Sequence, residues 1–361
     1  MNKQRSLLFD FILCVLFLLA IAEPTSGQQK EIPKGRVERI KIHGKGLEGN
    51  LSGDSADRFV SVYLPASYGK NPTRRYPVVY FLHGYTDDDA KFYGFSKHWM
   101  TLPPILDTVF AGGKAGEMIV VTPNAYTRFQ GSMYSNSITT GNWEDFVARE
   151  LVAYIDSHYR TLTKRESRGL SGHSMGGYGA LRIGQKYPDV FSAVYLLSPC
   201  CLAASPNTDV IPPTFLRADS IKTIAQFEKA DFGTKVLFAS AAAWSPNPAA
   251  PPFYIDLPVK NGQLQPQVLA KWTANRPLVT LDQYISNLKQ LRALAFDAGT
   301  RDQSIAASIK VLDEELNKYR IQHFFEIYEG DHINRVAERI EQKMLLFFSQ
   351  NLLFDGSKGK R

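Results

Sequence analysis

Hydrophobic and polar residues alternate near the start of the chain and later give way to continuous apolar runs. Residues 36–43 and 58–64 alternate as half-exposed antiparallel strands do. Residues 76–82 and 118–123 are almost entirely apolar, which is typical of strands covered on both faces. Four later segments also have the length and composition of strands: 167–171, 191–197, 291–296 and 323–328. The chain therefore contains a series of strands, most of them buried.

Helical spacing appears between these strands. The pattern predicts a helix over 146–159 and another over 175–187, which Pro188 ends. Two more are expected near the end of the chain, with apolar faces formed by Ile305, Ile309, Leu312, Leu316 and Tyr319 and by Val336, Ile340, Met344 and Phe347. Strands that alternate with helices indicate an α/β fold, with a mainly parallel sheet and helices on both faces.

The segment between residues 198 and 291 interrupts this rhythm. It is rich in proline and carries aromatic residues that look exposed: Trp244, Phe253, Tyr254 and Trp272. An insertion between two strands is typical of a cap over a site, so we expect a cap-like insertion at about 202–290. The alternative is a loosely packed surface excursion. If the segment is a cap, Trp244, Phe253 and Tyr254 are candidate substrate-binding residues.

The sequence Gly172-His-Ser-Met-Gly176 matches Gly-x-Ser-x-Gly, the pattern of a nucleophile elbow. There a serine occupies a strained strand-to-helix turn, and the flanking glycines avoid a collision between a Cβ and the neighbouring backbone. Ser174 would be the nucleophile, and the backbone N–H of Met175 would bind the oxyanion. The flanking strand and helix patterns support this interpretation.

An activated serine needs a base and a carboxylate that orients the base. In α/β-hydrolases these follow the serine in the order acid, then histidine, on loops at the carboxyl ends of strands. Asp302 and His332 satisfy this order and placement. We therefore expect Ser174, Asp302 and His332 to form a catalytic triad.

Other residues compete for these roles. Asp297 is predicted within or at the end of a strand, and Asp331 adjoins His332, so its side chain is expected to point elsewhere. His323 begins a strand, and His173 lies inside the elbow, where packing is the expected role. The remaining candidate histidines precede the nucleophile: His43, His98 and His158.

The second oxyanion donor is expected in the loop after the early buried strand, which reads His83-Gly84-Tyr85. Gly84 permits the sharp turn, and the N–H of Tyr85 is the first choice. The N–H of Gly84 is the alternative. His83 is expected to be a structural hydrogen-bonding residue.

The first 22 residues have the pattern of a secretory signal peptide. Lys3 and Arg5 precede an apolar run that ends in Ala20-Ile21-Ala22, a typical cleavage pattern. A membrane anchor is the alternative, but the run is short and no basic stop-transfer cluster follows, so no stable membrane insertion is expected. We predict a secreted or periplasmic protein with a linker at 23–35, one domain at 36–355 and a basic tail at 356–361.

Composition narrows the possible partners. The hydrophobic content of 44% and charged content of 21% are ordinary for a globular protein. The net charge of +7 is scattered rather than gathered beside aromatic residues, which argues against nucleic acid. Cys200 and Cys201 are adjacent, which implies no disulfide framework. No metal-ligand spacing occurs, and serine chemistry requires no cofactor, so neither a metal nor a cofactor is expected.

The chain resembles the esterase D-like branch of the α/β-hydrolases over about residues 58–348. The segments that carry the resemblance are 76–84, 141–146, 172–177, 299–302 and 330–332. This family includes feruloyl and acetyl-xylan-type esterases, S-formylglutathione hydrolases, siderophore esterases and mycolyltransferases. The resemblance implies the same triad and an oxyanion hole at Tyr85 and Met175. The segment 198–291 departs from the compact members.

The resemblance and the predicted export together suggest a substrate. A secreted serine carboxylesterase would act through an acyl-enzyme on feruloyl or acetyl esters of plant cell-wall polysaccharide, whereas glutathione thioesters belong to the cytosol. The alternatives of the same fold are a general short-chain carboxylesterase and an acyltransferase. A non-catalytic carbohydrate-binding protein on a hydrolase scaffold is the alternative from another class. The sequence does not indicate an oligomeric state.

Overall fold

The computed structural model of the protein describes residues 32–203 and 211–356. The predicted signal peptide lies outside the described residues, as do most of the predicted linker and almost all of the predicted basic tail. Residues from Pro33 onward form one compact unit, which includes the segment predicted as an insertion. In the described part of the chain, no helix is long and apolar enough to cross a bilayer.

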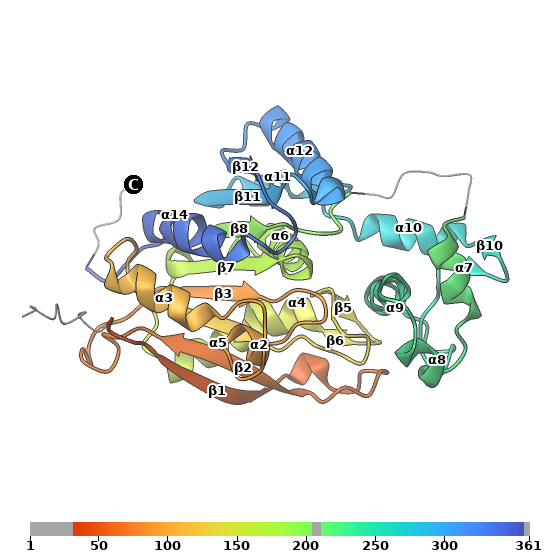
Figure 1. Ribbon diagram of the computed structural model, residues 1–361, viewed down its shortest axis with the longest axis horizontal. Helices are drawn as coiled ribbons and strands as arrows, with labels where there is room; N and C mark the ends of the chain where they lie inside the picture. The colour runs from red at the N-terminus through yellow and green to blue at the C-terminus, as the bar shows by residue number, and fades with distance from the viewer. Residues whose placement is uncertain (1–31, 204–210, 357–361) are drawn as a thin grey trace, which may run out of the picture. The chain divides into compact units, whose positions relative to one another are not determined.

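Eight strands of the described residues form one sheet in the order β1-β2-β4-β3-β7-β8-β11-β12 (Figure 1). Their bounds are β1 Arg36–His43, β2 Asp57–Leu64, β3 Val78–Leu82, β4 Ile119–Pro123, β7 Arg168–His173, β8 Ala193–Leu197, β11 Ala293–Gly299 and β12 Phe324–Tyr328. β2 pairs antiparallel with both β1 and β4, and the other neighbours are parallel. The predicted mainly parallel α/β sheet is confirmed.

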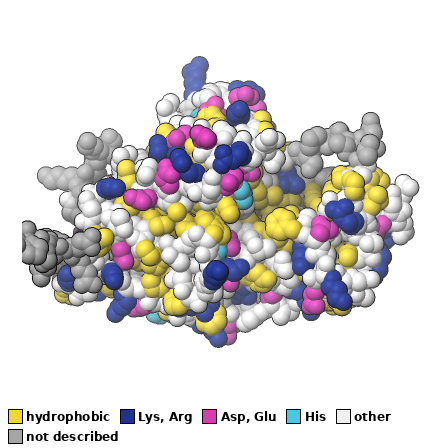
Figure 2. All heavy atoms as spheres, in the orientation of Figure 1, with side chains coloured by type: hydrophobic (Ala, Val, Ile, Leu, Met, Phe, Trp, Pro, Cys, Tyr) yellow, Lys and Arg dark blue, Asp and Glu magenta, His cyan; other side chains and the backbone are white. Residues whose placement is uncertain are grey.

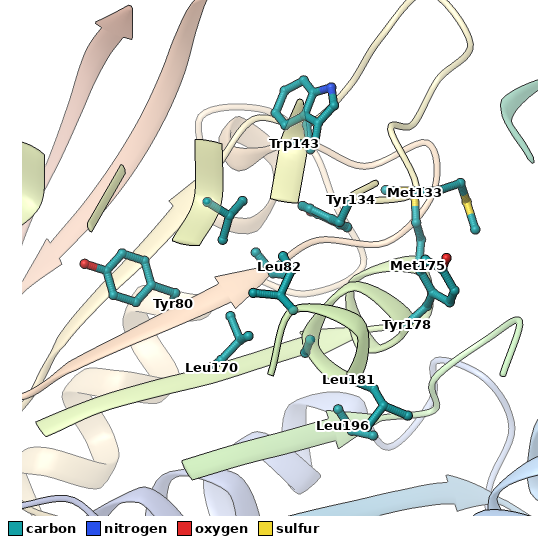
Figure 3. Close-up of a cluster of buried hydrophobic side chains, with 14 of the residues drawn as sticks. Tyr80, Leu82, Met133, Tyr134, Trp143, Leu170, Met175, Tyr178, Leu181 and Leu196 are labelled. Carbon is teal, nitrogen blue, oxygen red and sulfur yellow. The ribbon is translucent and has the colours of Figure 1, made fainter. Parts of the chain in front are cut away.

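The two faces of the sheet are covered by different helices. On β3, Tyr80 and Leu82 belong to a core that also contains α6, whereas Val79 and Phe81 face the opposite core. The helices on the first side are α4 Trp143–Asp145, continued through a π-helical turn at Phe146–Leu151 into α5 Val152–His158, then α6 Met175–Lys186 and α12 Gln303–Lys318. Those on the other side are α3 Leu102–Ala111 and the last helix, formed by α13 Val336–Arg339, a π-helical turn at Ile340–Met344 and α14 Leu345–Asn351. Figure 3 shows Met175, Tyr178 and Leu181 of α6 beside Leu82 and Leu196 in the first core.

Short elements complete the body. They are α2 Asp89–Phe92, the 3-10 turns Lys45–Leu47 and Arg165–Ser167, and the small hairpin of β5 Asn136–Ser137 and β6 Gly141–Asn142. The predicted strands and helices agree with the structure to within a few residues. Two details differ. β11 continues through Asp297 to Gly299, so the turn begins later than expected, and Phe348 rather than Phe347 is the fully buried aromatic of the last helix.

The insertion is a helical segment whose buried aromatic side chains are continuous with the core on the first side of the sheet. It contains α7 Pro213–Ser220, α8 Ile224–Glu228, α9 Phe232–Trp244, β9 Val259–Lys260, β10 Gln263–Leu264, α10 Pro266–Ala274, a 3-10 turn at Leu281–Tyr284 and α11 Ile285–Leu288. The expectation of exposed aromatics is wrong here, because Trp244, Phe253 and Trp272 are only 3%, 7% and 6% exposed. Trp244 packs against Trp272 with ring centres 5.6 Å apart, and Phe253 packs against Phe238 at 4.8 Å. These side chains hold the helices of the insertion together.

Candidate active site

The parallel strands bring the candidate residues to one edge of the sheet. The ladders pair Leu82 with Gly172, His173 with Leu197, and Gly299 with Tyr328, close to the carboxyl ends of these strands. The loops that follow β3, β7, β11 and β12 therefore open on the same side. These loops carry Tyr85, Ser174, Asp302 and His332, respectively.

Ser174 occupies a sharp turn between β7 and α6. Its backbone has φ 56° and ψ −113°, a conformation that L residues rarely adopt. A Cβ on Gly172 would lie 2.4 Å from the backbone of Gly176, and a Cβ on Gly176 would lie 1.9 Å from the carbonyl oxygen of Leu82. Both contacts are impossible for any larger residue. The turn thus has the strained backbone and glycine packing predicted for a nucleophile elbow.

The structure brings the three predicted triad residues into one hydrogen-bonded chain. His332 Nε2 lies 2.9 Å from Ser174 Oγ, and His332 Nδ1 lies 2.6 Å from Asp302 Oδ2. A carboxylate only accepts, so Nδ1 carries the proton and Nε2 is free to accept the serine proton. Asp302 is well covered, whereas the imidazole remains about one-third exposed. This arrangement can activate a hydroxyl and then return its proton to a leaving group.

The competing carboxylates are engaged elsewhere. Asp297 lies inside β11, where Tyr195 Oη donates to it at 2.7 Å and Arg339 Nε at 2.8 Å. Asp331 Oδ1 accepts the backbone N–H groups of Ile333 and Asn334, which lowers the pKa of that carboxyl. Neither aspartate is bonded to the imidazole of His332, so the geometry favours Asp302.

The side chains of Tyr85 and Met175, the two residues predicted to supply oxyanion donors, lie beside each other. A Cβ on Gly131 would be 2.7 Å from both Met175 Sδ and Tyr85 Cδ2, so both side chains flank the same glycine. Met175 is the first residue of α6, and its N–H therefore has no acceptor within the helix. The Tyr85 hydroxyl donates to the carbonyl of Phe129 at 3.0 Å. Their role in binding an oxyanion stays a prediction.

His83 supports the loop that carries Tyr85. Its Nδ1 lies 2.8 Å from the carbonyl of Gly84, and its Nε2 accepts the N–H of Ala125 at 2.8 Å. Complete burial of the ring lowers the pKa of His83. Because both ring nitrogens are bonded to the backbone, His83 has the geometry of the structural residue that the sequence predicted.

A cleft of about 630 Å³ opens onto Ser174 and His332. Its mouth carries three large and exposed apolar side chains: Trp99 is 41% exposed, Phe232 66% and Ile333 43%. Figure 2 shows hydrophobic side chains and a histidine on the face where the body of the protein meets the insertion. The insertion contributes Phe232, the first residue of α9, whose ring packs against Tyr85 at 5.6 Å.

The predicted substrate-binding aromatics do not line this cleft. Trp244 and Phe253 lie in the core of the insertion, and Tyr254, which is half-buried, also lies outside the cleft lining. Sequence reasoning missed Trp99 and Phe232. Phe232 directly follows Asp231, whose carboxylate caps α9 by accepting the N–H of Thr234, and this capping signal was the available clue to its position at a helix end.

The site shows no sign of metal ligation. Among the described residues, no group of three or more His, Cys, Asp and Glu side chains is placed to hold a metal ion. Cys200 and Cys201 are free thiols on the loop after β8, and the Cys200 N–H donates to the carbonyl of Ser174 at 3.1 Å.

Comparison with known sequences agrees with this geometry. Residues 55–336 match the family described as Putative esterase. The chain is 32% identical over 141 residues to the Mycobacterium tuberculosis protein Esterase Rv1288, covering 37% of this chain and 27% of that protein. It is 30% identical over 173 residues to the Endo-1,4-beta-xylanase/feruloyl esterase of Xylanibacter ruminicola, covering 47% of this chain and 22% of that protein. The chain thus matches about a quarter of the length of these curated relatives.

Solved structures share the fold. A ferulic acid esterase superposes with a TM-score of 0.62 at 22% identity, covering 89% of this chain and 99% of the other. An S-formylglutathione hydrolase from Agrobacterium tumefaciens gives a TM-score of 0.55 at 16% identity, covering 90% and 98%. These likenesses extend over the body and the insertion together. Since the family match covers most of the chain, the protein belongs to the Putative esterase family.

Proposed function

We propose that this protein is a serine carboxylesterase that works through an acyl-enzyme. The observation that carries the proposal is the unbroken chain of hydrogen bonds from Ser174 through His332 to Asp302, set on a strained elbow. A histidine with a purely structural role is not expected to contact a serine through one ring nitrogen and a carboxylate through the other, beside an open cleft.

The geometry supports a two-step reaction. His332 Nε2 takes the proton of Ser174 as Oγ attacks the ester carbonyl, and the N–H groups of Tyr85 and Met175 bind the oxyanion. The proton then passes to the leaving alcohol, and the acyl group stays on Ser174. Water, deprotonated by the same imidazole, releases the acid and restores the serine. Asp302 keeps the imidazole in the correct tautomer throughout and stabilises its charged form.

The direct test is Ser174→Ala with p-nitrophenyl acetate as the substrate. We expect kcat to fall by at least about 10⁴-fold while the circular dichroism spectrum and melting temperature remain close to those of the wild type. Ser157→Ala, which changes an exposed serine on α5, is the matched control and should retain full activity. Hydrolysis that persists in the Ser174 variant would remove the proposal.

For the substrate, we propose feruloyl or acetyl esters of plant cell-wall polysaccharide. The aromatic mouth formed by Trp99 and Phe232 suits a planar acyl group, which aromatic side chains bind by stacking or edge contact. Several relatives and structural neighbours are named as feruloyl or ferulic acid esterases, which supports the same substrate.

Product analysis separates this substrate from the alternatives. Release of ferulate from feruloylated arabinoxylan at a higher kcat/KM than that for p-nitrophenyl acetate is the expected result. Activity on small synthetic short-chain esters, with no release of ferulate or acetate from the polysaccharide, would indicate a general carboxylesterase instead. Transfer of the acyl group to an added alcohol, with little free acid, would indicate an acyltransferase, and sugar binding without turnover of any ester would indicate a binding protein.

We also propose that the protein is exported after cleavage behind Ala22. The support is the basic, apolar and small-residue pattern of residues 1–22. N-terminal sequencing of the protein recovered from a secreting host should begin at Glu23. A retained Met1 would contradict the proposal.

A further inference from the structure

His173 is the last residue of β7 and directly precedes the candidate nucleophile. Its side chain is buried, with 3% of the residue exposed, and it points toward the loop that carries the candidate base. His173 Nε2 lies 2.8 Å from the backbone carbonyl oxygen of His332. A carbonyl oxygen only accepts hydrogen bonds, so Nε2 carries a proton and donates it. The residue before the serine thus holds the main chain of the histidine that the serine needs.

The surroundings of the other ring nitrogen favour the neutral form of His173. Nδ1 is buried and has no hydrogen-bond partner in the described part of the chain. Burial, and the neighbouring imidazole of His332, lower the pKa of His173 to about 4. The titratable groups that face the ring are His332, Asp87 and Asp302. A neutral ring suits this place, because a second positive charge would oppose the imidazolium that forms on His332 during the reaction.

Aromatic packing fixes the orientation of the His173 ring. The Trp99 ring lies edge-on to it with centroids 5.7 Å apart, and Trp99 in turn contacts His98 at 4.7 Å. His98 is bonded through Nδ1 to the carbonyl of Met100 at 2.8 Å and through Nε2 to Asp87 at 3.1 Å. The ring of His173 is therefore packed on one side by Trp99, which itself packs against a histidine bonded to the backbone.

Other hydrogen bonds hold the residues that flank His332 on its loop. Asp331 caps the following turn through Ile333 and Asn334, and the N–H of Arg301 donates to the carbonyl of Gly330 at 2.9 Å. These bonds hold the residues on either side of His332. The bond from His173 holds the main chain of His332 itself, and it ties that loop to the strand that ends at the serine.

We propose that His173 is a positioning residue of the esterase reaction: its Nε2–H holds the main chain of His332 so that the imidazole stays within reach of Ser174 Oγ. The inference rests on the proposed function and adds to it a residue outside the triad. A displacement of about 1 Å at a reacting group costs about 10²-fold in rate. The loss of this bond should therefore slow the chemistry while leaving the cleft that binds the substrate intact.

The matched pair His173→Gln and His173→Met tests the role of the N–H group. Both side chains have the same length, but only glutamine places an N–H where Nε2 lies. With p-nitrophenyl acetate, we expect kcat of the methionine variant to fall about 10- to 100-fold with KM changed less than about 3-fold. The glutamine variant should remain within about 3-fold of the wild type in both parameters.

A second readout does not depend on turnover. The proton between His332 Nδ1 and Asp302 should give a separate low-field proton NMR signal, because the bond is only 2.6 Å long. This signal should persist in His173→Gln and broaden or vanish in His173→Met, since a mobile loop exposes the proton to exchange. Labelling of Ser174 by a fluorophosphonate should slow in parallel.

The outcomes separate the inference from the proposed function. If the wild type hydrolyses esters and the two variants have equal kcat and equal low-field signals, the positioning role is wrong. The positioning role would also be wrong if kcat fell equally in both variants, in step with the melting temperature. His173 would then act only through packing. If the wild type hydrolyses no ester, the proposed function fails, and the NMR signal alone then decides whether His173 orders the loop.

Discussion

The two walls of the cleft are built in different ways. The wall that carries the triad belongs to the sheet, and its positions are set by main-chain geometry: the φ of Ser174, the glycines around it and the ends of the parallel strands. The opposite wall comes from the insertion, where side chains such as Trp244 and Trp272 hold short helices together. Within the described part of the insertion, Phe232 is the residue that lines the cleft.

We infer from this difference that the sheet wall determines the chemistry and that the insertion influences substrate selectivity. A backbone contact cannot adjust by rotating a side chain, so the sheet wall should tolerate almost no substitution. An exposed aromatic ring on a helix end can change without disturbing the residues beneath it. We therefore expect changes in the sheet wall to abolish turnover and changes in the insertion to alter either the choice of acyl group or stability.

The largest effect is expected for Gly176→Ala. The new Cβ would meet the carbonyl oxygen of Leu82, which is backbone and cannot move aside. We expect activity on p-nitrophenyl acetate to fall more than about 10³-fold, with the free energy of unfolding lowered by about 3 kcal/mol. Gly69→Ala is the control, since a Cβ there meets nothing within 4 Å. An active and stable Gly176 variant would show that the elbow is not a rigid backbone contact.

The next largest effect is expected for Asp302→Asn, which should lower kcat about 10³- to 10⁴-fold while the fold is retained. The amide favours the wrong tautomer of His332 and stabilises its charged form poorly. Asp331→Asn is the matched control, because that side chain caps a turn and does not contact the imidazole. Steady-state kinetics of both variants checks the assignment, and equal losses in the two would contradict it.

Changing two phenylalanines of the insertion to leucine tests whether its cleft-lining and its buried residues have different roles. Phe232→Leu should lower kcat/KM for a feruloyl ester about 3- to 10-fold relative to an acetyl ester, because an aromatic contact is lost at the mouth. Phe253→Leu should leave this ratio unchanged and lower the free energy of unfolding by about 1 kcal/mol, because its ring is buried. Substrate selectivity and urea unfolding measure the two effects. A change of selectivity in the Phe253 variant, with none in the Phe232 variant, would contradict the assignment of the cleft.

The smallest effect concerns the pH dependence of stability. The pKa of His173 is lowered to about 4 by burial, whereas the unfolded chain has the ordinary value of 6.5. The unfolded state therefore binds a proton first, and stability is lost as the pH falls from 6.5 towards 4. His173→Gln removes this contribution, so its urea midpoint should drop less than that of the wild type between pH 7 and pH 5. Parallel decreases would contradict the assignment.

Patterns of buried and exposed residues were sufficient to predict the sheet, and the motif and chain order selected Ser174, Asp302 and His332, which the structure brings together. Residues 36–43 alternate because one face of an edge strand is solvated, and the predicted bounds of β1 match the structure. Ser174, Asp302 and His332 were found because the fold requires an order along the chain as well as a residue type. Their loops then converge as a consequence of parallel pairing.

The cleft wall could not be predicted in the same way. The sequence identifies the aromatic residues of the insertion but does not show which face of a helix they occupy. Trp244, which is buried, was therefore predicted to bind substrate, whereas Phe232 was not. Trp99 follows a short helix and a turn, where no periodicity guides prediction. The contact of His173 with His332 joins residues 159 positions apart, and only the packed loops bring them together.

The path of the insertion has a consequence for engineering. Strands β8 and β11 flank the insertion along the chain, yet they are neighbours in the sheet, with Ala193 opposite Ala293. The ladder between them is complete whatever the length of the connection. We expect that a crossover transplanted from another esterase, if it restores contacts such as that of Trp244 with Tyr178, would remodel acyl preference while the ladder between β8 and β11 retains the nucleophile and its base.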